Sequence, residues 1–139
     1  MARLICDTGV LYAAIDADDA DHSVCRRLLS GPQDRLLVPA PVIVELDWLL
    51  SSRVGHSAVD ALLADIESGA LEVVELTPAD YSRVRDLAQQ YVDLRLGLVD
   101  ASVVAVAERL DCPDIATLDR RHFSVIRPAS GGQFRLLPE

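Results

Sequence analysis

Apolar and polar positions alternate in blocks along the chain, and the blocks are of two kinds. Short apolar runs have the length of buried strands; they cover residues 3–6, 35–40, 71–76, 114–118 and 134–137. Longer segments between them carry apolar residues at helical spacing; they cover 8–16, 22–30, 41–53, 57–68, 77–91 and 96–110. The pattern therefore predicts strands that alternate with helices.

Residues at the ends of the predicted helices support this division. Thr77 and Pro78 have the residue types favoured at an N-cap and at the first helical position. Gly69 follows the preceding helix, and glycine commonly ends helices. The acidic loop at 16–21 offers Asp side chains that can cap the helix at 22–30.

Alternation of this kind predicts an α/β fold with a parallel central sheet of four to five strands and helices on both faces. The 139 residues fit one domain, 1–139. Half of the residues are hydrophobic but only 4% are aromatic, so we expect an aliphatic core. In such sheets ligands bind outside the carboxyl ends of the strands.

Four acidic residues are predicted to meet at that edge of the sheet. Asp7 and Asp119 directly follow the first and fourth predicted strands. Glu45 and Asp100 stand in the first turns of the third and the last predicted helices, among apolar neighbours. Carboxylates gathered in one crevice repel each other, and a hard cation with oxygen ligands, Mg²⁺ or Mn²⁺, relieves the repulsion. We therefore expect a metal site.

Each acid also has a plainer interpretation. Asp100 could be an acid favoured by the helix dipole. Asp7 and Asp119 could be simple helix caps. Glu45 could form a buried salt bridge with an arginine. The hypothesis of a shared site rests on all four acids standing at the same edge of the predicted sheet.

The charge balance limits the partners of the chain. The formal net charge is −9, and all 13 basic residues are arginine. This argues against nucleic-acid binding through a broad basic surface, and it fits a basic protein partner. It leaves room for an enzyme that meets nucleic acid through metal ions and a local patch such as Arg120 and Arg121.

Cysteine content and apolar runs predict the compartment. The three cysteines form no CxxC pair, so we expect reduced, buried thiols. No apolar run is long enough to span a membrane, and the first residues lack the apolar region of a secretory signal. We expect a cytoplasmic protein without a membrane association.

Four segments together resemble a known family: ICDTGVLYAAID (5–16), PVIVELDWLL (41–50), LGLVDASVVAVAERL (96–110) and IATLDRRHF (115–123). In this order and spacing they resemble the PIN-domain ribonucleases, and most of all the VapC-type toxins of bacterial VapBC toxin–antitoxin pairs. The resemblance covers nearly the whole chain. One small departure is Arg95, where many relatives have proline.

The resemblance implies a metal-dependent endoribonuclease. Asp7 and Asp100 match the acids that most directly ligate Mg²⁺ or Mn²⁺, and Glu45 and Asp119 match those that complete the metal shell and orient the water. It also implies an RNA substrate, a VapB-type antitoxin that holds the enzyme inactive, and a homodimer. Thr8 and Thr117 stand where they could hydrogen-bond the carboxylates.

Other functions fit the sequence less well. Haloacid-dehalogenase-like phosphatases need a second Asp two residues after the first, where this chain has Gly9; receiver domains need a lysine, which is absent. A dinucleotide-binding GxGxxG is also absent. A catalytically silent PIN-like binding module remains the alternative. His122 lies near the expected site, but no histidine pair has zinc-ligand spacing, and we do not count it among the site residues.

Overall fold

The computed structural model describes residues 2–32 and 35–139. In this part of the chain one parallel sheet of five strands has the order β3-β2-β1-β4-β5. The strands are β1 (Arg3–Cys6), β2 (Arg35–Pro39), β3 (Glu72–Val74), β4 (Asp114–Ala116) and β5 (Arg135–Leu137). The predicted α/β class and parallel sheet are confirmed.

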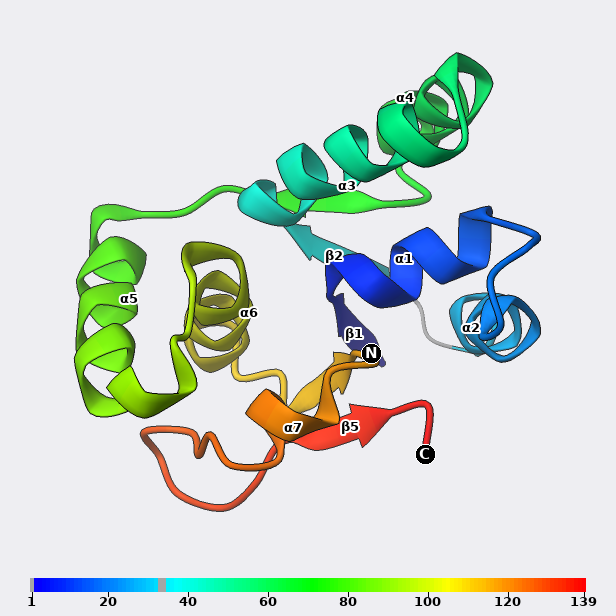
Figure 1. Cartoon of the computed structure of the whole chain (residues 1–139). Coiled ribbons are helices and arrows are strands. Elements are labelled where there is room, and N and C mark those ends of the chain that lie inside the picture. Colours follow the sequence, from blue (N-terminus) through cyan, green and yellow to red (C-terminus); the bar gives the residue numbers. More distant parts are fainter. Residues whose placement is uncertain (1, 33–34) are drawn as a thin grey trace.

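Helices lie on both sides of the sheet. They are α1 (Thr8–Ile15), α2 (His22–Leu29), α3 (Ala40–Arg53), α4 (His56–Ser68), α5 (Pro78–Gln90), α6 (Leu98–Arg109) and α7 (Arg120–Phe123), with a 3₁₀ turn η1 (Val92–Leu94). In Figure 1, α1 and α2 lie to the right of the strands, and the packed pair α5 and α6 lies to the left. Right-handed crossovers produce this division, because the chain moves outward from β1 to β3 and then returns past β1 to β4.

The core is aliphatic, as the composition predicts. Strand β1 is buried from Leu4 to Cys6, and α6 is buried continuously from Ala101 to Ala107. A helix buried over almost two turns must be covered by other elements on all sides. This packing places its first turn at the edge of the sheet. The three cysteines are free and buried, which confirms the expected reduced thiols. Among the described residues, no helix combines the length and apolar content needed to cross a bilayer.

Two strands are shorter than the apolar runs that predict them. The run at 71–76 yields only β3, since the backbone N–H of Leu71 donates to the carbonyl of Asp65 and so closes the end of α4. The run at 114–118 yields only β4. After Ala116 the chain turns, and the Thr117 hydroxyl accepts a hydrogen bond from the Asp119 N–H. Apolar runs record burial, and here burial extends beyond the ladder of paired strands.

The predicted helix ends are correct in two cases and wrong in one. Thr77 and Asp80 form a reciprocal capping box at the start of α5. Gly69 ends α4 in the left-handed region, with φ of +86°. Asp21 precedes α2 but makes no side-chain cap there; its N–H instead donates to the carboxylate of Asp19. The acidic loop therefore stabilises itself rather than the helix.

The segment before α6 differs most from the expectation. The helical pattern at 96–110 begins two residues late, at Leu98, with Gly97 as N-cap. Arg95 adopts φ of +52° after η1. Proline, whose ring holds φ near about −65°, cannot adopt this conformation. Arginine at this position is therefore compatible with a tight left-handed turn into α6 that the proline of the relatives would prevent.

The order of the strands predicts a binding crevice at the carboxyl ends of β1 and β4. The chain leaves β1 toward β2 on one side and reaches β4 on the other, so the strand order reverses there. Open α/β sheets bind ligands at such a switch point, outside the carboxyl ends of the strands. Cys6 pairs with Ala116 in the ladder, and the next residues of both strands enter the crevice.

Candidate active site

Asp7 lies at the floor of the crevice, where β1 ends and α1 begins. Its residue is only 6% exposed. Its Oδ1 accepts the backbone N–H of Thr8 at 2.8 Å, and its Oδ2 accepts the hydroxyl of Thr117 at 3.0 Å. The first contact makes it the N-cap of α1. Asp7 is thus a helix cap, as the plainer interpretation proposes. A capping role alone does not explain why the carboxylate is buried.

The electrostatics of Asp7 are those of a carboxylate held in unfavourable surroundings. The pKa of Asp7 is raised from its usual 3.8 to about 6, and burial is the largest cause. The charge of Asp100 also contributes to the increase, and that of Glu45 contributes less. The two hydrogen bonds from Thr8 and Thr117 act in the opposite direction. A nearby cation would reverse this balance, because it favours the charged form.

The two threonines next to the acids have different roles. Thr117 is fully buried and binds Asp7, as the sequence suggests. Thr8 binds Asp7 only through its backbone N–H. Its own hydroxyl oxygen is buried and has no hydrogen-bond partner among the described residues. A buried hydroxyl without a partner is costly, and it is a polar atom available to a water or a ligand in the crevice.

Asp100 projects from the first turn of α6. Its side chain is a quarter exposed. Burial raises its pKa, as do the charges of Asp119 and Glu45, while the hydrogen bond from His122 lowers it. If Asp100 served only to interact with the dipole of α6, no other acids would be expected near it. The surrounding carboxylates show that Asp100 belongs to an acidic cluster.

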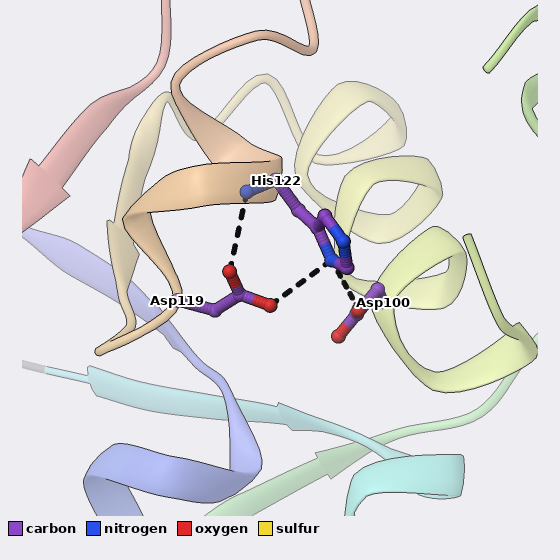
Figure 2. Close-up of side chains that lie close together, drawn as sticks. All are labelled: Asp100, Asp119 and His122. Atoms are coloured by element: carbon purple, nitrogen blue, oxygen red, sulfur yellow. Dashed lines mark hydrogen bonds and ion pairs between the residues drawn. The ribbon is translucent and has the colours of Figure 1, made fainter. Parts of the chain in front are cut away.

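Asp119 and His122 complete the wall of the crevice (Figure 2). Asp119 is the N-cap of α7, and its Oδ1 accepts the backbone N–H of His122 at 3.2 Å. Its Oδ2 lies 3.0 Å from Nδ1 of the same histidine. That ring nitrogen also lies 3.3 Å from Oδ2 of Asp100. His122 therefore joins two elements, α6 and α7, through their acids.

Glu45 stands at the rim. It is exposed on α3, and in the described part of the chain it makes no hydrogen bond or ion pair. A buried salt bridge with an arginine is therefore not what holds it. Its charge nevertheless acts on both Asp7 and Asp100, which places it on the crevice side of the helix.

The four predicted acids thus share one crevice but do not form one tight group. Asp100, Asp119 and His122 offer ligand atoms within 4.8 Å of one another, and this is the cluster found in the described residues. Asp7 and Glu45 lie outside it and interact with it through their charges. Sequence reasoning left out His122, whose only signal was its place three residues after Asp119.

The two arginines next to Asp119 differ in their contacts. Arg120 donates to the backbone carbonyls of Leu136 and Pro138, so it ties α7 to the end of β5. Both residues, Arg120 and Arg121, are exposed, and Arg120 already donates to the backbone beside β5.

The donor set fits Mg²⁺ or Mn²⁺. Carboxylate oxygens from Asp7, Asp100 and Asp119 are the ligands these hard cations prefer. The carboxylates raise one another's pKa, and in the described part of the chain Asp7 is bound by Thr8 and Thr117 and forms no ion pair. A divalent cation would supply the missing positive charge.

Comparison with known proteins agrees with this arrangement. Residues 4–127 match the family model for the PIN domain. The chain is 38% identical over 135 residues to Ribonuclease VapC26 of Mycobacterium tuberculosis, covering 97% of this chain and 100% of that protein.

Solved structures share the fold. Mycobacterium tuberculosis VapC20, a Sarcin-Ricin loop cleaving toxin, aligns with a TM-score of 0.75 at 24% identity, over 81% of this chain and 86% of that chain. VapBC2 from Rickettsia felis, solved bound to a DNA fragment from its promoter, aligns with a TM-score of 0.67 at 16% identity, over 89% of this chain and 92% of that chain. FitAcB from Neisseria gonorrhoeae aligns with a TM-score of 0.64 at 17% identity, over 95% of this chain and 96% of that chain. The chain therefore belongs to the PIN-domain family, among its VapC proteins.

Proposed function

We propose that this protein is an endoribonuclease that requires Mg²⁺ or Mn²⁺ and acts as the toxin of a toxin–antitoxin pair. The observation that carries the proposal is the acidic crevice at the switch point between β1 and β4, in a chain 38% identical to a VapC ribonuclease. Asp7, Asp100 and Asp119 would hold the metal, with Glu45 at the rim.

Each residue of the crevice has a part in hydrolysis of a phosphodiester bond. When bound, a divalent cation lowers the pKa of a water molecule and stabilises the negative charge that develops on the phosphate. Thr117 and the Thr8 N–H fix both oxygens of Asp7, so that this ligand is oriented in advance. Glu45 is exposed and unpaired among the described residues, and it can orient the attacking water and accept its proton.

The net charge of −9 shapes the expected mode of RNA binding. A protein so acidic gains little from general attraction to phosphate. Recognition then depends on local contacts, and unpaired bases in single-stranded or looped RNA are the parts open to such contacts. The proposal places the protein in the cytoplasm, where RNA is accessible.

Incubation of the purified chain with structured RNA tests the activity. Cleavage should require Mg²⁺ or Mn²⁺, stop in EDTA, and be lost in Asp100→Asn. Asp86→Asn, an exposed acid on α5, is the matched control and should cut like the natural chain. Metal binding without cleavage of any RNA would instead support the silent binding module.

We also infer a VapB-type protein partner and a homodimer. A basic side chain placed among the four acids would cancel their repulsion and exclude the metal, so the complex should be inactive. Co-expression with a VapB-type protein from the same organism should yield a complex that no longer cuts RNA. Light scattering of the isolated chain should give twice the monomer mass of 15.1 kDa; a value of one monomer would contradict the dimer.

A further inference from the structure

We propose that His122 is itself a metal ligand through Nδ1, together with Asp100 and Asp119, and that this nitrogen makes the site favour Mn²⁺ over Mg²⁺. The inference rests on the proposed function, since it concerns the same metal. It adds a residue and a metal preference that the acidic crevice alone does not imply.

The first support is the spacing of the three side chains. Nδ1 of His122 lies 3.0 Å from Oδ2 of Asp119 and 3.3 Å from Oδ2 of Asp100. Neighbouring ligands of an octahedral ion, at metal–ligand distances of about 2.1 Å, lie about 3.0 Å apart. The two observed separations therefore match those expected between ligands of one ion.

The second support is the number of protons available. Nδ1 of an imidazole carries at most one hydrogen, yet two carboxylate oxygens face it. Hydrogen-bond geometry is met only toward Asp100, at the long distance of 3.3 Å. One hydrogen cannot satisfy both acids well, whereas a cation among the three atoms would bind all of them.

The third support is that the backbone carrying the ring is held in place. The backbone N–H of His122 is fixed by the cap of Asp119, in a helix tied to β5 by Arg120. The imidazole side chain is only 14% exposed. The chain thus fixes the backbone that carries the ring, and Nδ1 lies at the edge where Asp100 and Asp119 meet.

A nitrogen ligand changes the relative affinity of the site for Mn²⁺ and Mg²⁺. Mg²⁺ prefers oxygen ligands, while imidazole suits transition metals, and affinities for nitrogen and oxygen sites rise from Mn²⁺ along the first row. Replacement of His122 should therefore weaken Mn²⁺ binding more than Mg²⁺ binding. A histidine that only positions the carboxylates would affect both metals alike.

Pulsed electron paramagnetic resonance of the Mn²⁺-loaded chain tests the assignment. A directly bound imidazole produces a ¹⁴N coupling, which should be present in the natural chain and absent in His122→Asn. His56→Asn, at an exposed histidine on α4, is the control and should keep the coupling. Titration calorimetry with Mn²⁺ alone and Mg²⁺ alone then gives the change in preference.

The outcomes separate this inference from the proposed function. If Mn²⁺ binds and RNA is cut but no ¹⁴N coupling is seen in the natural chain, His122 is not a ligand and the nuclease stands. If His122→Asn keeps the coupling, the inference is also wrong. If the chain neither binds Mn²⁺ nor cuts RNA, the proposed function fails. Should the variant not fold, the natural chain with ¹⁵N-labelled histidine decides, because only a ligating histidine changes the coupling.

Discussion

The hydroxyl of Thr117 donates to Oδ2 of Asp7 across the boundary between β4 and β1, at 3.0 Å and out of contact with solvent. The hydroxyl oxygen of Thr117 in turn accepts the N–H of Asp119 at 3.0 Å. One buried threonine therefore holds the floor of the crevice and the start of its wall in fixed relation.

Replacement of Thr117 by valine should disturb both. The buried Asp7 carboxylate and the Asp119 N–H would each lose a partner, at a cost of about 1–3 kcal/mol in the free energy of unfolding. The hydrogen bond lowers the pKa of Asp7, so its loss should raise that pKa further. Urea unfolding and a carboxyl NMR titration measure the two effects. Thr117→Ser keeps the hydroxyl and should leave the pKa unchanged; an unchanged pKa in Thr117→Val would contradict the assignment.

The pKa of Asp7 also predicts how stability depends on pH. Its folded value, about 6, lies above its usual 3.8. The favourable contribution of Asp7 is therefore present in full below about pH 4 and is lost as pH rises through 6. In EDTA, Asp7→Asn should match the natural chain near pH 4 and exceed its stability by up to about 3 kcal/mol above pH 7.

Denaturant unfolding from pH 4 to pH 8 measures this difference. Asp47→Asn, an exposed acid on α3, should show no such rise. If the natural chain proved more stable than Asp7→Asn at pH 7 without metal, the carboxylate would be stabilising the fold, and the strain attributed to it would not exist.

The sequence is sufficient to predict the sheet and the three acids that follow strands or begin the buried helix. Asp7, Asp100 and Asp119 lie where alternation and the switch-point rule place them, because strand ends and first helical turns have fixed positions in such a fold. Glu45 also faces the crevice, although it is exposed rather than enclosed. The metal-ligand roles of all four acids stay predictions.

His122 illustrates what sequence patterns do not contain. Its helix, α7, has only four residues and no apolar periodicity. The direction of its ring depends on a cap by Asp119 and on the approach of α6, a helix that ends at Arg109. Likewise, Arg95 adopts its left-handed conformation at the end of η1 although arginine has no local preference for it. Such features arise from contacts between distant segments.

Away from the crevice, Asp80 should be the acid on which stability depends most. It is 3% exposed, caps α5 and binds Arg109 at 3.0 Å. Burial raises the pKa of Asp80, but the hydrogen bonds from Thr77 and Arg109 outweigh burial and lower it overall. Its contribution is therefore present at neutral pH and lost as pH falls below its usual 3.8.

Asp80→Ala should accordingly cost about 1–3 kcal/mol at pH 7, because it removes the capping bond of α5 and a hydrogen bond to the charged Arg109. The cost should shrink toward pH 2. Thermal and urea unfolding at the two pH values measure it, and RNA cleavage by the folded fraction should be unchanged. A cost below about 1 kcal/mol at pH 7 would show that the pair is not stabilising.

Binding of the proposed metal should also stabilise the folded chain. A cation that binds only the folded chain stabilises it by about 2.7 kcal/mol at a hundredfold excess over its Kd, so the Tm should rise with Mn²⁺ or Mg²⁺ concentration. Asp100→Asn should blunt the rise, while Asp86→Asn should not. Protons compete with the metal for carboxylates of raised pKa, so the rise should be smaller at pH 5 than at pH 8. A Tm that does not change with the concentration of either metal would exclude the crevice as their binding site.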